Sequence, residues 1–518
     1  MNTLDAVLAT HAAQRPEKVA LVCEGRRVTY GTIAEESDRW ARALRACGLA
    51  PGARVGYLGK ESEHYYVLLY ACAKSGAVLV PVNWRFTSDE VDHILRDSES
   101  ELLFVEEEFL DVAEKLQAGL PRLRAMVLLD CADPAGVPLA EWKAAGTEQG
   151  EPWRATADDP VVQLYTSGTT GFPKGVVLAH RSFFAVREAL DDSGEDWIDW
   201  RPDDVSLIGV PGSHVGGLWW ATQGFNAGIT NVAMRVFASK EAIALVRQLG
   251  VTVTCMVPAM LLMLLAEPET DRSDFVSLRK VVYGGSPISE SLLNRCMEVM
   301  QCEFAQIYGL TETGNTAVCL PPAAHLRGGE LLKAAGRPYP GFAVKIVDDR
   351  GRQLPPGEVG EVCLRTPARM VEYWRLPEAT ERTLVDGWVH TGDAGYLSQE
   401  GYLFIHDRIK DMIIRAGENV YPAEVEKALS AHPDVADVAV IGVPDPRWGE
   451  AVHAFVQSRS GGRIPPRELK SFLRDRIADY KIPSKYEFID RVPRNASGKI
   501  LRRTLRDGRW SAQDRQVN

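Results

Sequence analysis

The sequence lacks the features that mark membrane and secreted proteins. Its most apolar stretch, residues 256–266, is shorter than a membrane span and contains Pro258, so it cannot cross a bilayer as a helix. The N-terminal run MNTLDAVLATHAAQRPEK has neither the basic segment nor the long apolar segment of a signal peptide. We therefore expect a cytoplasmic protein without a membrane span.

Paired cysteines are also missing. The nine cysteines form no CxxC pair, and most of them sit in apolar runs such as residues 318–320 and 362–364. This pattern is typical of buried thiols in a reducing compartment, and it favours neither disulfides nor a zinc site.

The sequence has no excess of basic residues either. Its formal net charge of -11 argues against a nucleic-acid partner, because such a partner is usually bound by a basic face. A local basic loop can still bind an anionic small molecule in spite of a distant acidic surface. The hydrophobic fraction of 45% and the charged fraction of 25% are those of a globular protein rather than a disordered one.

The length and the rhythm of the apolar segments predict an α/β protein of several lobes. A chain of 518 residues exceeds the roughly 250 to 300 residues that one core sustains. Helical and strand patterns alternate over residues 1–150 and 160–320, short strands and turns follow over 335–408, and the alternation returns after Lys410. We expect a large N-terminal body of stacked βαβ-type subdomains, a small β-barrel-like lobe and a compact α+β C-terminal domain.

The same patterns predict individual elements. Helices are expected over residues 37–47, 65–75, 422–430 and 466–478. Strands are expected over residues 54–58, 77–82, 101–105, 161–165, 252–256, 280–283, 303–308, 343–347, 360–365, 401–405, 435–442 and 486–490. No low-complexity linker separates the lobes, so the joint before the C-terminal domain must be short.

The most informative motif is the run TSGTTGFPKG at residues 166–175, which follows a predicted strand. Its glycines let the backbone approach an anion closely, and its hydroxyls, N–H groups and Lys174 are suited to holding phosphates. The run is not a Walker A loop, because Lys174 lies between Pro173 and Gly175 rather than between Gly and Ser or Thr. We interpret it as a phosphate-binding loop of another class.

Four further runs are weak when taken one at a time. Each has an ordinary explanation: a turn, a solvated aspartate, a charged hairpin or a basic chain end. Their side chains are nevertheless those that a nucleotide requires, namely an aromatic ring, hydroxyls, carboxylates that suit Mg²⁺ or ribose, and a lysine. The runs are YGLTE at 308–312, GWVHTGD at 387–393, DRIKDMIIRAGENVYPAEVE at 407–426 and PRNASGKILRR at 493–503.

Together and in this order, the five runs resemble the adenylate-forming superfamily of acyl-CoA synthetases, luciferases and peptide-synthetase adenylation domains. The resemblance covers almost the whole chain, from VTYGTIAEESDRWARAL at 28–44 to SGKILRR at 497–503. It implies two half-reactions. A carboxylate attacks the α-phosphate of MgATP to give acyl-AMP and pyrophosphate, and a thiol, in this branch that of coenzyme A, then displaces AMP.

The resemblance also implies roles for individual residues in the first half-reaction. Thr311 contacts the α-phosphate, Glu312 binds Mg²⁺, and Lys499 bridges the substrate carboxylate and the α-phosphate. The remaining nucleotide contacts fall into three groups: the β- and γ-phosphates are held by Thr166, Ser167, Gly168, Thr169, Thr170 and Lys174; the adenine side is formed by Gly284, Gly285, Ser286, Pro287, Gln306, Tyr308 and Gly309; and the ribose is held by Asp393 and Arg408.

For the second half-reaction, the resemblance implies a swing of the C-terminal domain. The domains are then residues 1–409 and 410–518, with the hinge at Lys410. The swing removes Lys499 and brings a thiol tunnel at Ala416 and Gly417 to the acyl group. Ala416 departs from the glycine that many family members have at this position.

The resemblance places the acyl site around the run PGSHVGGL at 211–218. His214 matches a gate in acyl- and aryl-CoA ligases and is counted among the catalytic residues, although a structural histidine is the alternative. Ser213 stands where the family often has a large aromatic residue, and Trp219 and Met260 make the candidate pocket apolar. We expect a hydrophobic acid, which can be medium-chain, aromatic or polycyclic.

Within the superfamily, an acyl-CoA synthetase is favoured over an amino-acid activator. The ending SGKILRR differs from the NGK(I/V)DR of amino-acid activators, and SHVGGLWW offers no acidic partner for an ammonium group. A luciferase would share the same loops. A stand-alone ligase that loads a carrier protein and a non-catalytic nucleotide-binding paralogue remain alternatives. The expected partners are a small carboxylic acid, ATP and coenzyme A; a homodimer is left open.

Overall fold

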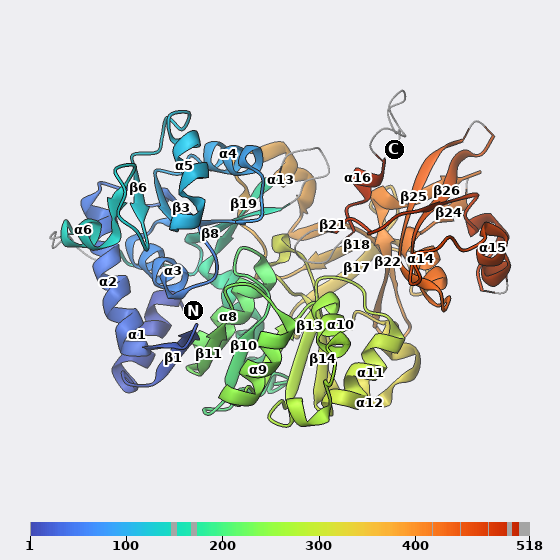
Figure 1. Ribbon diagram of the computed structural model, residues 1–518, viewed down its shortest axis with the longest axis horizontal. Coiled ribbons are helices and arrows are strands. Elements are labelled where there is room, and N and C mark those ends of the chain that lie inside the picture. The colour runs from blue at the N-terminus through green and yellow to red at the C-terminus, as the bar shows by residue number, and fades with distance from the viewer. Residues whose placement is uncertain are drawn as a thin grey trace. The chain divides into compact units, whose positions relative to one another are not determined.

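The computed structural model describes residues 2–146, 153–166, 173–416, 418–445, 447–474, 476–494 and 500–506 (Figure 1). The chain forms two compact units. The first comprises Met1–Leu332, Gly336–Ala343 and Leu364–Val389, and the second comprises Lys333–Ala335, Val344–Cys363 and His390–Asn518. The domain boundary expected at residue 410 lies inside the second unit and stays a prediction about motion.

The first unit contains a nine-stranded sheet in the order β16-β15-β14-β13-β12-β10-β11-β1-β2. Its six central strands pair in parallel, and β2, β15 and β16 are antiparallel at the two edges. The carboxyl ends of the parallel strands meet at one edge of the sheet, where α/β proteins bind ligands. The strands are β1 (Val19–Cys23), β2 (Arg26–Thr29), β10 (Val205–Ile208), β11 (Thr230–Ala233), β12 (Val253–Met256), β13 (Lys280–Gly284), β14 (Glu303–Tyr308), β15 (Val318–Leu320) and β16 (Arg337–Pro338).

An eight-stranded sheet forms the other layer of strands in the first unit, in the order β19-β9-β8-β4-β3-β5-β6-β7. β8 and β9 pair in antiparallel fashion on either side of the phosphate-loop candidate, and Thr166 and Lys174 are the paired residues nearest to it. The strands are β3 (Arg54–Leu58), β4 (Val78–Val82), β5 (Leu102–Val105), β6 (Ala125–Leu128), β7 (Val137–Pro138), β8 (Pro160–Thr166), β9 (Lys174–Ala179) and β19 (Glu372–Tyr373).

The helices of the first unit pack apolar faces against these sheets. One core joins side chains of α9, α10 and α11 to β12, β13 and β14, among them Leu261, Leu293 and Val281. The helices are α1 (Leu4–Gln14), α2 (Tyr30–Ala46), α3 (Glu63–Ser75), α4 (Ser88–Asp97), α5 (Leu110–Gln117), α6 (Leu139–Ala144), α7 (Ala185–Ser193), α8 (Val215–Ala227), α9 (Ser239–Leu249), α10 (Pro258–Ala266), α11 (Glu290–Met300), α12 (Pro322–Arg327) and α13 (Pro377–Thr383).

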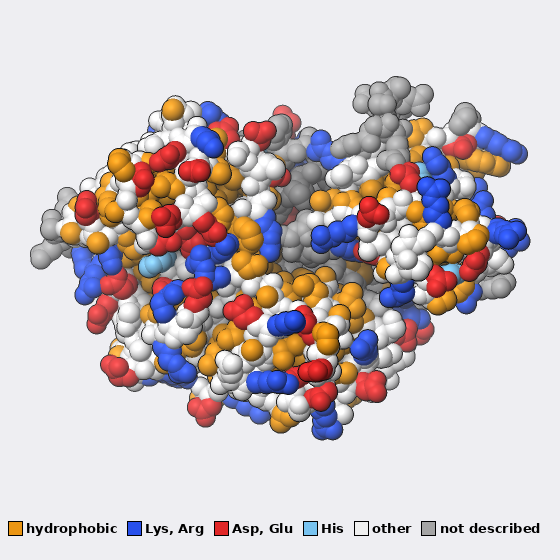
Figure 2. All heavy atoms as spheres, in the orientation of Figure 1, with side chains coloured by type: hydrophobic (Ala, Val, Ile, Leu, Met, Phe, Trp, Pro, Cys, Tyr) orange, Lys and Arg blue, Asp and Glu red, His pale blue; other side chains and the backbone are white. Residues whose placement is uncertain are grey.

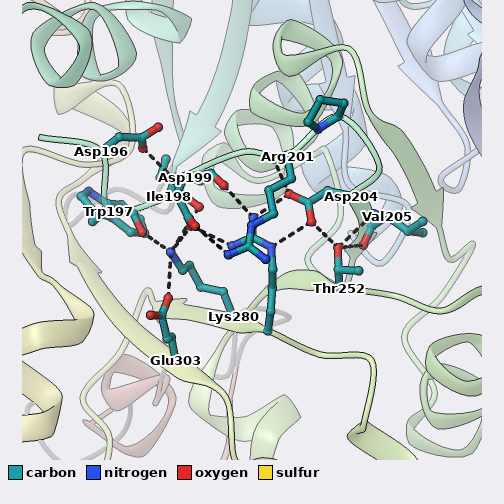
Figure 3. A network of polar contacts seen from close by, with 12 residues as sticks. Asp196, Trp197, Ile198, Asp199, Arg201, Asp204, Val205, Thr252, Lys280 and Glu303 are labelled. Carbon is teal, nitrogen blue, oxygen red and sulfur yellow. Dashed lines mark hydrogen bonds and ion pairs between the residues drawn. The ribbon is translucent and has the colours of Figure 1, made fainter. Parts of the chain in front are cut away.

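At the amino ends of the parallel strands, charged side chains form a closed network (Figure 3). Arg279 donates to Asp204 at 2.6 Å and to Asp199 at 2.7 Å. Lys280 pairs with Asp199 and, at 3.1 Å, with Glu303. The network joins the segment before β10 to the starts of β13 and β14.

The second unit holds a compact α+β region and most residues of a β-rich region, whose short strand at 384–385 falls among the residues of the first unit. β17 (Ala343–Val347), β18 (Gly360–Arg365), β21 (Trp388–Leu397) and β20 (Leu384–Val385) form a sheet in that order, and β22 (Leu403–Arg408) pairs with β21. A second sheet has the order β24-β23-β26-β25, with β27 beside β26. Its elements, with the three helices that follow β22, are β23 (Ile413–Arg415), β24 (Glu418–Val420), β25 (Val435–Asp445), β26 (Gly449–Ser458), β27 (Lys485–Phe488), α14 (Pro422–Ser430), α15 (Pro466–Arg474) and α16 (Arg502–Arg506).

The expected fold class is confirmed, and most element boundaries agree within two residues. The helix expected over 37–47 is longer, because α2 begins at Tyr30, where Thr29 caps it through a bond to the Thr32 N–H. The helix expected over 466–478 ends as α15 at Arg474, and the chain continues in a short 3₁₀ turn at Asp479–Lys481. All nine cysteines are free thiols. Among the described residues, every helix is too short or too polar to cross a membrane.

Candidate active site

The carboxyl edge of the nine-stranded sheet holds the predicted adenine side of the site. β13 ends at Gly284, which pairs with Ile307 of β14, so the turns after the two strands are neighbours. A Cβ on Gly284 would lie 2.5 Å from the Ile307 carbonyl oxygen, and Gly285 has a φ of +79°. Glycine is therefore required at both positions, for close approach at one and for backbone conformation at the other. Ser286 and Pro287 follow in the same turn.

Gln306 and Tyr308 lie on β14 beside this turn. The Tyr283 hydroxyl lies 3.1 Å from Gln306 Oε1 and 3.0 Å from His325 Nε2. A residue of the neighbouring strand β13 therefore fixes the position of the Gln306 side chain. Burial raises the pKa of Tyr283, which keeps this phenol protonated. The structure thus brings the predicted adenine residues of two strands together at one edge.

The YGLTE run forms a tightly packed turn. Gly309 is required there, because a Cβ would lie 2.3 Å from the Asn315 carbonyl oxygen. Thr311 and Glu312 start a 3₁₀ turn, and Thr313 Oγ1 accepts the Leu310 N–H at 2.8 Å. Thr311 and Glu312 are partly exposed, so their oxygens are accessible to a ligand.

Tyr373 connects this turn to the phosphate-loop hairpin. Its hydroxyl donates to Glu312 Oε1 at 2.6 Å, and Lys174 Nζ lies 4.7 Å from the centre of its ring. The adjacent Trp374 N–H donates to the Gly175 carbonyl at 2.7 Å. Sequence reasoning missed Tyr373, since the run EYW carries no recognisable motif. Ser167, Gly168, Thr169 and Thr170 lie outside the described residues, so their contacts with phosphates stay a prediction.

His214 is the residue just before α8 in the predicted acyl region, and its side chain makes no capping hydrogen bond to the helix. Asn83 Nδ2 lies 3.4 Å from His214 Nε2, which makes Nε2 the acceptor and places the ring proton on Nδ1. Burial, with a smaller effect from Arg85, lowers the pKa of His214 to about 4. The ring is therefore neutral at physiological pH.

Glycines bring α8 close to its surroundings. A Cβ on Gly217 would lie 2.2 Å from the Val210 carbonyl oxygen, so the tight turn before the helix needs glycine. A Cβ on Gly216 would lie 3.7 Å from Asn315 Oδ1, and one on Gly209 would lie 3.8 Å from Met260 Sδ. The end of β10 thus lies near α10, and the start of α8 lies near both the residues after β10 and the segment after YGLTE. That these segments line an acyl pocket stays a prediction.

Polar atoms in this region that have no protein partner among the described residues include Ser213 Oγ, Asn315 Nδ2 and the indole nitrogens of Trp219 and Trp220. Asn315 also adopts a φ of +93°, which is rare for a residue with a Cβ. Trp219 is fully buried, with its ring 6.3 Å from that of Trp220. A place for Trp219 in the acyl pocket stays a prediction.

In the second unit, the two predicted ribose contacts are neighbours. Asp393 of β21 pairs with Arg408 of β22, and Arg408 Nε lies 2.7 Å from Asp393 Oδ1. Thr391 Oγ1 accepts the Asp393 N–H at 3.0 Å, and the Thr391 carbonyl accepts from Arg408 at 3.1 Å. The sheet register explains how residues far apart in the sequence form one pair.

The remaining predicted residues lie mostly beyond what can be described. Lys410 lies in the 3₁₀ turn Ile409–Asp411, but its side chain is outside the described part, as are Gly417 and Lys499. Ala416 has a φ of +54°, and its N–H donates to the Trp448 carbonyl at 2.8 Å. Alanine therefore occupies a left-handed conformation that favours glycine.

Residues 8–374 match the AMP-binding enzyme family, and residues 424–499 match the AMP-binding enzyme C-terminal domain. The chain belongs to the AMP-binding enzyme family. As a member, it is an ATP-dependent, adenylate-forming ligase. The resemblance carried by the five sequence runs is confirmed.

Relatives of this AMP-binding enzyme act on different acids and thiols. It is 61% identical over 100% of its length, and 98% of the relative's, to the fatty acid–[acyl-carrier-protein] ligase ScoC of Streptomyces coeruleorubidus. It is 37% identical over 96% of both chains to a feruloyl-CoA synthase of an Amycolatopsis species. Among solved structures, o-succinylbenzoate CoA synthetase of Bacillus subtilis with its acyl-adenylate has a TM-score of 0.84 and 31% identity, covering 97% of this chain and 98% of that one.

Proposed function

We propose that the protein activates a fatty or other hydrophobic carboxylic acid with MgATP, giving acyl-AMP and pyrophosphate, and transfers the acyl group to a phosphopantetheine thiol. The 61% identity over the full length to a fatty acid–[acyl-carrier-protein] ligase favours a carrier protein as the acceptor. Coenzyme A is the second candidate. It is supported by the similarity to the feruloyl-CoA synthase and to an indoleacetate–CoA ligase at 36% identity. Both acceptors present the same thiol arm.

The first half-reaction has to bring two anions together. Positioning and electrostatic stabilisation are therefore the main tasks of the site. Lys174 supplies a positive charge at the end of the phosphate loop, and Thr311 supplies a hydroxyl for the α-phosphate. Lys499 would neutralise the acid carboxylate and the α-phosphate while the carboxylate oxygen attacks phosphorus and pyrophosphate leaves.

Glu312 suits Mg²⁺, which prefers oxygen ligands and retains several waters. Its carboxylate is partly exposed, and Tyr373 holds one oxygen by a 2.6 Å hydrogen bond. When bound, the ion would neutralise charge on the phosphates. Tyr373 orients the carboxylate and, through its ring, keeps Lys174 nearby.

The acyl side favours an uncharged tail. His214 is neutral and lies beside Asn83, and Met260 adds an apolar wall near Gly209. The unpartnered Ser213 and Asn315 atoms would favour an acid with a polar substituent near its carboxyl end over a plain alkyl chain. In the second half-reaction the thiol attacks the acyl carbon and AMP leaves, after the proposed swing about Lys410.

ATP–pyrophosphate exchange with a panel of acids tests the activation step. Exchange that depends on a hydrophobic acid and on Mg²⁺ is expected, and its absence across saturated, hydroxylated and aromatic acids would contradict the proposal.

A second experiment compares the rates of thioester formation for three acceptors: coenzyme A, pantetheine and a phosphopantetheinylated carrier protein. Faster transfer to coenzyme A than to the carrier would select the second candidate.

Helix α15 supplies a charge argument for the carrier. Arg463 precedes the helix, and Arg467, Lys470 and Arg474 lie along it with exposed or partly exposed side chains, in a chain whose net charge is -11 (Figure 2). An acidic carrier protein would be attracted to this end of the second unit. Lys470→Glu with Arg474→Glu should raise the KM for the carrier about tenfold and leave the KM for pantetheine unchanged. Equal changes for both acceptors would exclude docking there.

A further inference from the structure

Three side chains with different metal-binding atoms meet on two adjacent strands of the second unit. Glu361 and Cys363 lie two residues apart on β18, and His390 lies on β21, the neighbouring strand. His390 Nδ1 lies 2.8 Å from Glu361 Oε2 and 3.6 Å from Cys363 Sγ. One ligand atom of each residue lies within 4.8 Å of the other two. The cluster therefore converges on a single point.

The separations suit a tetrahedral ion with nitrogen, sulfur and oxygen ligands. Bonds of about 2.0 Å to nitrogen and 2.3 Å to sulfur at a tetrahedral angle place these atoms roughly 3.5 Å apart. The His390–Cys363 separation is 3.6 Å in the protein. The hydrogen-bonded Glu361–His390 pair, at 2.8 Å, has to open by about half an ångström.

One side of the Glu361–Cys363–His390 cluster is buried, and the other side is open to solvent. Cys363 is fully buried, whereas the His390 and Glu361 side chains are 23% and 25% exposed, so water can reach a fourth position. Glu361 Oε1 accepts the Gly392 N–H at 3.0 Å, which orients the carboxylate and leaves Oε2 toward the cluster. The positive charge of Lys345 also acts on the Cys363 thiol and would oppose a cation.

We propose that Glu361, Cys363 and His390 form a binding site for a zinc-class divalent cation, with water as the fourth ligand. The ion displaces the thiol proton to solvent and bonds to the thiolate. His390 binds through Nδ1 as the neutral tautomer whose single ring proton is on Nε2, and exchange with water moves that proton from Nδ1 to Nε2. The site ties β18 to β21 just before Thr391 and Asp393, so its occupation stiffens the strand that carries the proposed ribose contact.

A second cluster in the same unit serves as an internal comparison. His432, Asp434 and Glu468 also place ligand atoms within 4.8 Å of one another. There the His432 Nδ1 already accepts the Asp434 N–H at 3.2 Å, the two carboxylates are exposed, and no thiol is included. Only the Cys363 cluster can give a metal–thiolate signal.

Cobalt substitution tests the site without reference to ligase activity. The full chain, freed of any histidine tag and treated with a chelator, is titrated with Co²⁺. We expect thiolate-to-cobalt charge-transfer absorption in the near ultraviolet, tetrahedral bands in the visible, and saturation at one ion per chain. Zn²⁺ should bleach these bands.

Matched variants identify the ligands. Cys363→Ser should abolish the charge-transfer band, and His390→Gln should weaken binding at least tenfold. Cys131→Ser removes a partly exposed thiol close to Asp130 and Asp133, and it should leave the spectrum unchanged. His432→Gln should also leave it unchanged.

A variant that removes a nearby positive charge should strengthen metal binding rather than weaken it. Lys345→Met should tighten Co²⁺ binding about threefold to tenfold, because the bound ion and the lost proton add one net positive charge near that lysine. Absence of the bands, or their persistence in Cys363→Ser, would overturn the proposal. Circular dichroism and the unfolding temperature of each variant without metal show that a lost band is not lost folding.

Discussion

The two edges of the nine-stranded sheet use side chains in opposite ways. At the amino edge, Asp199, Asp204, Arg279 and Lys280 satisfy one another in a closed network (Figure 3). At the carboxyl edge, glycines bring backbone close to backbone, and Glu312 keeps oxygens within reach of a ligand. The charges of the amino edge are paired with each other, whereas Glu312, the proposed Mg²⁺ ligand, stays partly exposed.

The energetics of the two edges differ accordingly. Asp204 is buried, and Arg279 is mostly buried, so each would be costly without the other. Within the described residues, the Glu312 carboxylate accepts one hydrogen bond, from Tyr373, and the bond from the Met370 N–H to the Glu312 backbone carbonyl survives a side-chain change, so loss of the carboxylate disturbs little of the fold. Variants at the amino edge should therefore affect stability, and variants at the carboxyl edge should affect catalysis.

The largest effect is expected from Asp204→Asn. It leaves the Arg279 guanidinium with one carboxylate fewer, and the free energy of unfolding should fall by about 3–5 kcal/mol in urea titrations. The exchange activity of the folded enzyme should stay within about twofold. Arg201→Ala is the control, because its ion pair with Asp199 at 3.3 Å is exposed and should be worth less than about 1 kcal/mol.

Glu312→Gln is the counterpart at the carboxyl edge. Loss of the proposed Mg²⁺ ligand should lower the rate of ATP–pyrophosphate exchange about 10²- to 10³-fold, with a higher Mg²⁺ requirement and an unchanged unfolding temperature. Tyr373→Phe keeps the carboxylate but removes its 2.6 Å hydrogen bond, so a smaller loss is expected. Full activity of Glu312→Gln would remove this edge from the active site.

Gly284→Ala tests whether close backbone approach also supports function. A Cβ 2.5 Å from the Ile307 carbonyl oxygen forces β13 and β14 apart, at a cost of about 1–3 kcal/mol. The KM for ATP should rise severalfold while the KM for the acid changes little. An unchanged KM for ATP would show that adenine binds elsewhere.

The pH dependence of stability separates the contribution of His214 from that of the ion-pair network. Burial lowers the pKa of His214 from 6.5 to about 4, so the unfolded chain binds the extra proton between these values. Stability should rise with pH across that window, and His214 should account for about 1–3 kcal/mol of the rise. His214→Gln should flatten this part of the profile.

The ion-pair network responds to pH in a different range. Burial opposes ionisation of Asp204, but its bonds to Arg279 lower the pKa of Asp204 below 3.8. The contribution of Asp204 to stability is therefore lost only in stronger acid.

Local sequence was a good guide where backbone conformation is decided by nearby residues. The apolar rhythm predicted β17, β18 and α14 with the bounds that the structure has, since turn residues surround each of them. The start of α2 was placed too late, because the first turns present Tyr30 and Ile33 to the core before the amphipathic pattern becomes regular. The site residues were named by resemblance, and their roles remain predictions.

What local sequence could not supply was the identity of neighbours across strands. Tyr373 bridges Lys174 and Glu312 from almost two hundred residues beyond the lysine, without a motif of its own. The short antiparallel pairing of β19 with β9 places Tyr373 beside the strand that begins at Lys174. Strand pairing, rather than spacing in the chain, decides such contacts.

Local sequence was enough for the α/β class and, through five ordered runs, for membership of the adenylate-forming ligases, because glycines, hydroxyls and charges at fixed local spacing already constrain the backbone. Tertiary structure alone decided which distant groups meet: Asp393 with Arg408, and Glu361 and Cys363 with His390. The absence of a CxxC pair argued against zinc, but spacing along the chain cannot reveal ligands that come from two strands. Sheet register brings them together, and register is set by packing of the whole sheet.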